Sequence, residues 1–122
     1  MSQGIILFAH GARDPRWAEP LEATAAGLRR RRPGVDVRLA FLEFIAPTLA
    51  IAADAMIGAG CTRLDVVPLF LGAGGHVRRD LPEMVQGVRE RHPHCVVTLH
   101  TAAGETPAVI EALAQAADEL TR

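Results

Sequence analysis

Short apolar runs alternate with longer amphipathic segments along this chain, and the alternation is regular from end to end. Each run is rich in branched and aromatic side chains, which is typical of strands buried on both faces. The longer segments repeat their apolar residues at the spacing of a helix. We expect strands at 4–9, 35–42, 64–71 and 95–99, and helices at about 14–32, 47–59, 81–91 and 106–120. Strands that alternate with helices predict a parallel sheet covered by helices on both faces.

Capping residues and prolines set the predicted element boundaries. Asp14 is a good N-cap for the first helix, and Pro15 suits its first helical position. Asp80 and Glu83 form a similar start signature for the third helix. Pro68 conflicts with the third strand, because proline cannot donate to a strand ladder. We therefore keep the strand and predict a local irregularity at Pro68.

Two of the predicted helices differ in how their apolar residues are distributed. The second helix, which Pro47 opens, is apolar almost all the way round, and Asp54 is its only charge. A helix of that kind is buried on more than one side, and in so short a chain the second side suggests a homodimer. The last helix, which Thr106 and Pro107 cap, has a single apolar face. That face consists of Val109, Leu113, Ala116 or Ala117, and Leu120.

The order of the strands decides which loops lie together. Right-handed crossovers in a chain of this pattern predict an α/β three-layer sandwich, with a four-stranded parallel sheet of flavodoxin-like order 2-1-3-4. Ligands bind such sheets at the carboxyl ends of the strands, where the order switches between the first and third strands. His10 directly follows the first strand, and His76 ends the glycine-rich loop after the third. Glu43 follows the second strand, so we expect these three side chains to converge at one crevice.

Composition and charge narrow the class of protein. The chain has 122 residues, and thirteen basic against fourteen acidic side chains give a formal net charge of −1. These values suit one domain and give no sign of nucleic-acid binding. We see no apolar run long enough to span a membrane and no leader at the N-terminus. Cys61 and Cys95 are too few for a disulfide framework, so we expect reduced thiols and a cytoplasmic location. The arginine run 29–32 is typical of a solvated helix end.

The three converging groups suit metal chemistry. Imidazole is a good ligand for Co²⁺, Ni²⁺, Fe²⁺ and Zn²⁺. Two histidines with one carboxylate leave coordination positions open, as a catalytic or delivery site requires. No Gly-Lys-Ser/Thr follows the glycines before His76, which excludes a P-loop there. Ser2 is the only serine, so a Ser-His-Asp triad cannot be built.

Three stretches together resemble the CbiX/SirB family of class II chelatases, which insert cobalt, iron or nickel into sirohydrochlorin. They are Phe-Ala-His-Gly-Ala-Arg-Asp-Pro at 8–15, Phe-Leu-Glu-Phe at 41–44 with Pro47, and Val-Pro-Leu-Phe-Leu at 67–71 followed by Gly-Gly-His at 74–76. The resemblance covers essentially the whole chain and implies a single CbiX-like chelatase domain over 1–122. It also implies a homodimer that replaces two fused halves, and a reaction that needs no nucleotide or other organic cofactor.

The resemblance also implies roles for the site residues. His10 and His76 match the family's metal-binding and catalytic histidines, and Glu43 matches an acidic residue near the site. Insertion of a divalent metal releases two pyrrole N–H protons, so the site needs a metal ligand and a proton acceptor. Neutral imidazole can be either. We predict that His10 and His76 hold the metal and remove the protons, with Glu43 assisting, and their division of labour stays open.

The tetrapyrrole itself suggests further contacts. Because sirohydrochlorin carries many carboxylates, Arg13, Arg78 and Arg79 are candidate anchors, although loop arginines facing water are an equal alternative. Gly74 and Gly75 would let the backbone approach a flat macrocycle closely. Co²⁺ leads among the metals because the short form that this chain resembles is associated with the cobalamin route, and Fe²⁺ and Ni²⁺ stay open. A metal or tetrapyrrole carrier without turnover is the alternative to a chelatase.

Overall fold

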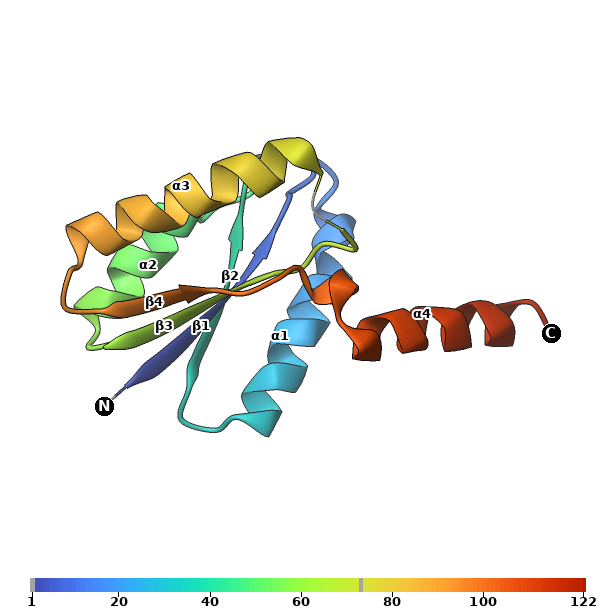
Figure 1. The fold of residues 1–122 in the computed structure, drawn as a ribbon. Coiled ribbons are helices and arrows are strands. Elements are labelled where there is room, and N and C mark those ends of the chain that lie inside the picture. The colour runs from blue at the N-terminus through green and yellow to red at the C-terminus, as the bar shows by residue number, and fades with distance from the viewer. Residues whose placement is uncertain (1, 73) are drawn as a thin grey trace.

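The computed structural model describes residues 2–72 and 74–122, without the side chain of His76. Its elements are β1 (Gln3–Ala9), η1 (Pro15–Ala18), α1 (Glu19–Arg31), β2 (Asp36–Phe41), α2 (Leu49–Gly58), β3 (Arg63–Pro68), α3 (Gly75–Arg91), β4 (Val96–Leu99), η2 (Ala103–Glu105) and α4 (Pro107–Leu120). The strands form one sheet in the order β2-β1-β3-β4, and every neighbouring pair is parallel (Figure 1). The predicted fold class and strand order are confirmed.

The core divides into two clusters because successive side chains of a strand point to opposite faces of the sheet. Ile6 and Phe8 of β1 join a large cluster that α2 and α3 cover. Ile5 and Leu7 point to the other face and join a smaller cluster under Ala25 of α1. β1 is therefore buried on both faces, as its unbroken apolar run predicts (Figure 1).

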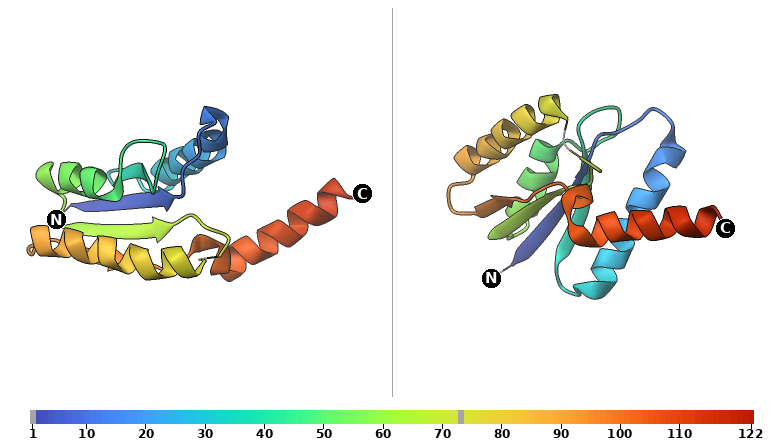
Figure 2. Two further views of the ribbon diagram at one scale, coloured as in Figure 1. Left: turned by 90° about the horizontal axis from the view of Figure 1, so that it is seen from above. Right: turned by 45° about the vertical axis from the view of Figure 1, so that its right-hand side comes forward.

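Helix α4 departs from the predicted packing. None of its residues is buried, and it projects away from the sheet, as the two views of Figure 2 show. Ile110, Leu113 and Leu120 are 55%, 47% and 85% exposed. The α1-side face of β3 and β4 consequently lacks a covering helix, and Val96 on that face is 64% exposed. The expectation that helices cover both faces completely is wrong for this part of the sheet.

Helix α3 begins at Gly75, six residues before the predicted start. The signature at Asp80 and Glu83 therefore lies inside the helix, and Pro82 lies inside it as well. A proline there removes one hydrogen bond and costs roughly 3 kcal/mol. Val77 and the buried Leu81 extend the apolar stripe that packs on the sheet, and this packing offsets the cost.

Two further boundaries differ from the prediction. Helix α2 begins at Leu49 rather than Pro47, because the Thr48 side chain accepts a hydrogen bond from the backbone N–H of Ile51 and caps the helix there. Strand β3 ends at Pro68 instead of continuing to residue 71. Its ladder with β4 ends at Val66, and Pro68 has no N–H with which to extend it. The predicted irregularity at Pro68 is thus the end of the strand.

Helix α2 buries one side in this chain. Leu49, Ala52, Ala53 and Met56 form the buried side, whereas Ile51 on the opposite side is 61% exposed. The second side is exposed in a single chain, so its predicted burial against another subunit stays a prediction. In the part of the chain that the structure describes, no helix is both long and apolar enough to cross a lipid bilayer.

Candidate functional site

His10 and Glu43 meet at the carboxyl edge of the sheet. His10 is the first residue after β1, and Glu43 lies two residues after β2. His10 Nε2 and Glu43 Oε1 are 3.7 Å apart, and the two side chains are 52% and 49% exposed. An imidazole and a carboxylate are therefore together, half open to solvent, at the place where parallel sheets bind ligands.

Backbone contacts fix this pair. Beyond the ends of the strands, the N–H of Leu42 donates to the Ala9 carbonyl, and the N–H of Glu43 donates to the His10 carbonyl at 3.0 Å. Gly11 then turns the chain with a φ of +100°, a conformation that side chains other than glycine rarely adopt. A Cβ at Gly11 would clash with the carbonyl oxygen of Glu43. The close approach of the two loops therefore requires glycine at this position.

The structure places His76 in the first turn of α3 rather than in the loop before it. The side chain of His76 lies outside the described residues, so its predicted convergence with His10 and Glu43 stays a prediction. Gly74 is the N-cap of α3, with an ordinary φ of −65°. A Cβ at Gly74 or Gly75 would meet no atom within 4 Å, so the fold itself does not require these glycines.

The predicted arginines occupy two separate elements. Arg13, in the loop after β1, holds its guanidinium carbon 5.0 Å from the ring centroid of Phe44. Arg78 on α3 lies 3.5 Å from Glu105 of η2 in an exposed ion pair. Arg79 is exposed on α3. Sequence reasoning gave no role to Phe44, because an aromatic side chain after a strand resembles core.

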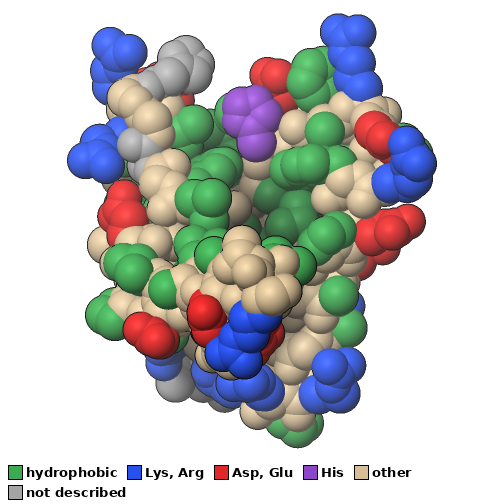
Figure 3. All heavy atoms as spheres, turned by 90° about the vertical axis from the view of Figure 1, so that its right-hand side faces the viewer, with side chains coloured by type: hydrophobic (Ala, Val, Ile, Leu, Met, Phe, Trp, Pro, Cys, Tyr) green, Lys and Arg blue, Asp and Glu red, His purple; other side chains and the backbone are tan. Residues whose placement is uncertain are grey.

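The His10 imidazole and the Glu43 carboxylate can bind a cation, and either group can accept a proton. Within the described residues, which leave out the side chain of His76, no three His, Cys, Asp or Glu side chains gather in a metal-binding group. Figure 3 shows a histidine side chain above a hollow lined by hydrophobic side chains, with basic side chains toward the corners of that face. Such a surface suits a flat apolar ligand that carries anionic groups at its edge.

The model of the CbiX family matches residues 4–120. This chain belongs to the CbiX family.

Relatives of this CbiX chain include proteins named as sirohydrochlorin chelatases. It is 30% identical over 118 residues to the sirohydrochlorin ferrochelatase of Priestia megaterium, covering 94% of this chain and 43% of that protein. It is 34% identical over 82 residues to the sirohydrochlorin cobaltochelatase of Methanosarcina barkeri, covering 67% of this chain and 63% of that one. The chain thus spans less than two thirds of these relatives.

Solved CbiX and SirB structures share the fold. A crystal structure of a CbiX protein from Marinobacter aquaeolei VT8 matches with a TM-score of 0.85 and 31% identity, covering 98% of this chain and 97% of that one. The sirohydrochlorin chelatase SirB from Bacillus subtilis subspecies spizizenii, in complex with cobalt, matches with a TM-score of 0.84 and 25% identity. This CbiX chain covers 51% of the SirB chain.

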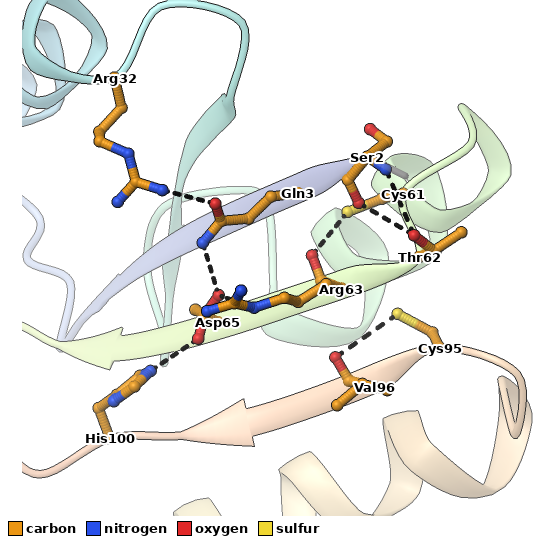
Figure 4. Close-up of polar contacts among 10 residues, drawn as sticks. All are labelled: Ser2, Gln3, Arg32, Cys61, Thr62, Arg63, Asp65, Cys95, Val96 and His100. Atoms are coloured by element: carbon orange, nitrogen blue, oxygen red, sulfur yellow. Dashed lines mark hydrogen bonds and ion pairs between the residues drawn. The ribbon is translucent and has the colours of Figure 1, made fainter.

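A second polar cluster in the CbiX chain lies on the sheet. His100 Nε2 is 2.8 Å from Asp65 Oδ1, and Gln3 Nε2 donates to the other carboxylate oxygen at 2.9 Å (Figure 4). Burial alone would raise the pKa of Asp65, but these hydrogen bonds and the charge of Arg63 lower it below its usual value. The cluster links β1, β3 and the end of β4. Its role is structural, because it supplies hydrogen bonds to both oxygens of the buried Asp65 carboxylate.

Proposed function

We propose that this chain inserts a divalent metal into sirohydrochlorin, with Co²⁺ as the first candidate and Fe²⁺ or Ni²⁺ as alternatives. The observation that carries the proposal is the His10–Glu43 pair at the carboxyl edge of the sheet, in a chain that the CbiX family matches from residue 4 to residue 120. The names of the relatives support both cobalt and iron.

The chemistry requires two functions from the site. The metal must be held weakly enough to be released, and the macrocycle must lose two pyrrole protons as two metal–nitrogen bonds replace two N–H bonds. His10 and Glu43 are half exposed and 3.7 Å apart, so both can reach a ligand that lies over the edge of the sheet. We assign metal binding to His10 and His76, because two histidine ligands leave coordination positions open. We assign proton acceptance to the same two histidines together with Glu43.

The basic side chains would orient the substrate. Arg13 lies near the His10 loop, and Arg78 and Arg79 lie on the first turns of α3, beside His76. A macrocycle with carboxylates on its rim would therefore meet guanidinium groups from two sides. The open space around Gly74 and Gly75 leaves room for its flat face.

We further propose that the working unit is a homodimer in which α4 packs on a second copy. The start of α4 is fastened to its own chain, because Gly104 of η2 donates its N–H to the Phe70 carbonyl. Fixed in this way, α4 leaves the uncovered face of β3 and β4 unfilled and keeps its own apolar face exposed. A second copy's α4 could lay its apolar face on the side of the sheet where Val96 is exposed.

A dimer of this kind would also bring a second surface to the site. Parallel strands end at one edge of the sheet, so α4, which follows β4, leaves from the edge that carries His10 and Glu43. A copy held by α4 would face this edge and shield the half-exposed pair from solvent. We propose that the chain forms one chelatase domain. We also propose that it acts in the cytoplasm, in keeping with its two buried cysteines that form no disulfide.

Metallation can be followed directly in the visible spectrum of sirohydrochlorin. We expect the purified protein to accelerate the spectral change with Co²⁺, and to a different extent with Fe²⁺ and Ni²⁺, without ATP. Rates equal to those without protein would contradict the proposal. A stable shift of the pigment spectrum without turnover would point to a carrier instead.

The oligomeric state is tested separately by analytical ultracentrifugation. We expect the wild type to sediment as a dimer and Leu113→Glu to sediment as a folded monomer, because the change puts a charge on the apolar face of α4. Glu111→Gln, on the polar side of the same helix, is the matched control. A monomeric wild type, or a dimer that Leu113→Glu leaves intact, would refute the role of α4.

A further inference from the structure

Phe44 holds a strained backbone conformation beside the candidate site. Its φ is +68°, and among the described residues it is the one residue other than glycine with a positive φ. The N–H of Ile45 donates to the Glu43 carbonyl at 2.9 Å, which closes a tight turn around Phe44. A turn of this kind with a positive central φ is the rarer and more strained form. Strain of this kind in a bulky residue persists where the surrounding structure holds it, and it is common at ligand sites.

Burial of the ring does not account for this strain. Phe44 is 56% exposed, whereas Phe8 and Phe41 are 0% and 4% exposed in the core. The guanidinium carbon of Arg13 lies over the ring, 5.0 Å from its centroid. Both side chains line a surface cavity of about 450 Å³. The chain thus holds an aromatic ring at the surface with a cation beside it.

The position of the ring is fixed relative to the catalytic candidates. Phe44 directly follows Glu43, whose backbone N–H is bonded to the His10 carbonyl. The close contact between Gly11 and Glu43 couples the same two loops. Because Glu43 is anchored on both sides of its peptide, the backbone of Phe44 keeps a constant place beside the residue that pairs with His10.

We infer that Phe44 is a stacking platform for the planar face of a carboxylate-bearing macrocycle, and that Arg13 pairs with a carboxylate at the edge of that macrocycle. The inference rests on the proposed function and adds to it a positioning residue. Aromatic rings stack on flat conjugated ligands, and a guanidinium beside the ring suits a carboxylate in a fixed geometry. Phe44 touches the pigment and holds it over the pair, while His10 and Glu43 carry the reaction.

Binding is measured with metal-free sirohydrochlorin, so that it is separated from metallation. Trp17 is the single tryptophan of the chain, and quenching of its fluorescence reports pigment binding. We expect Phe44→Leu to weaken binding by about fivefold to tenfold, in keeping with the size of aromatic stacking effects. Phe44→Tyr keeps the ring and should bind within about twofold of the wild type. Ile51→Ala is the matched control, because Ile51 is 61% exposed on α2 and does not line the cavity that Phe44 and Arg13 share.

Steady-state kinetics distinguish positioning from chemistry. Phe44→Leu should raise KM for the pigment while kcat stays near the wild-type value, because a stacking contact is made equally in the ground state and the transition state. Wild-type binding and KM in Phe44→Leu would overturn the platform and leave the chelatase proposal intact. A wild type that neither binds nor metallates the pigment would overturn both.

The strain gives an independent readout. Asparagine tolerates a positive φ better than phenylalanine, so Phe44→Asn should melt at or above the wild-type temperature and still bind pigment as weakly as Phe44→Leu. This opposite movement of stability and binding is expected only if the strain is kept for the ligand. A Phe44→Asn protein that melts well below the wild type would show that the ring supports the fold instead.

Discussion

Replacing Gly11 with alanine should damage both the fold and the site. Gly11 has a φ of +100°, and a Cβ there would clash with the backbone carbonyl of Glu43. The clash is with backbone, so no flexible side chain can move aside to relieve it. The two loops must separate, and the hydrogen bond from the Glu43 N–H to the His10 carbonyl would stretch or break.

The magnitude follows from these two costs. A left-handed conformation costs an alanine roughly 1–2 kcal/mol, and the lost hydrogen bond costs about 1 kcal/mol more. Gly11→Ala should therefore lose about 2–3 kcal/mol of unfolding free energy. With the urea dependence of small domains, that loss lowers the unfolding midpoint by roughly 1–2 M.

Urea unfolding followed by circular dichroism measures this shift. Gly58→Ala is the control, because Gly58 ends α2, has no positive φ and has no atom within 4 Å of the added Cβ. That substitution should stabilise the protein by up to about 1 kcal/mol. In the folded Gly11→Ala protein, metallation should also fall, since His10 and Glu43 no longer share one geometry. Equal midpoints for Gly11→Ala and the wild type would refute this reasoning.

Three further predictions concern the remainder of the fold. Because its partners lower the pKa of Asp65, this carboxylate stabilises the protein above its unfolded pKa of roughly 4, and that contribution is lost as the pH falls through the lower folded value. The melting temperature should fall with pH in that acid range, and Asp65→Asn should melt lower at neutral pH and show a flatter acid slope. Gly104→Ala places a Cβ against the Leu71 backbone and should destabilise the protein by about 2 kcal/mol or more in urea; an unchanged midpoint would contradict the packing of η2. Pro82→Ala restores an N–H inside α3 and should raise the free energy of unfolding by about 1 kcal/mol or more, whereas a lower urea midpoint would mean that the proline ring itself is needed.

The sheet could be predicted because its signal is dense and local. The apolar run around Ile6 and Phe8 predicts a central strand buried on both faces. Because His10 directly follows this run, the sequence also indicates which edge of the sheet carries the candidate site. The meeting of His10 with Glu43 followed from topology alone, since a parallel sheet brings all carboxyl ends to one edge.

Features that depend on tertiary context could not be predicted in this way. Asp80 and Glu83 are sound capping residues, but packing of Val77 and Leu81 on the sheet extends α3 across them. The amphipathic pattern of α4 is the same whether its apolar face packs on its own sheet or stays exposed. Phe44 carries no sequence signal of a positive φ, because that conformation comes from the contact between two loops.

The most direct test of the account compares Co²⁺ insertion into sirohydrochlorin by the wild type, His10→Ala and His94→Ala. His94 is an exposed histidine in the turn before β4 and serves as the control for losing an imidazole. We predict rapid metallation by the wild type and His94→Ala, and a rate near the protein-free background for a folded His10→Ala. Full activity in His10→Ala, or a wild type no faster than the background, would contradict a chelatase site at this edge of the sheet.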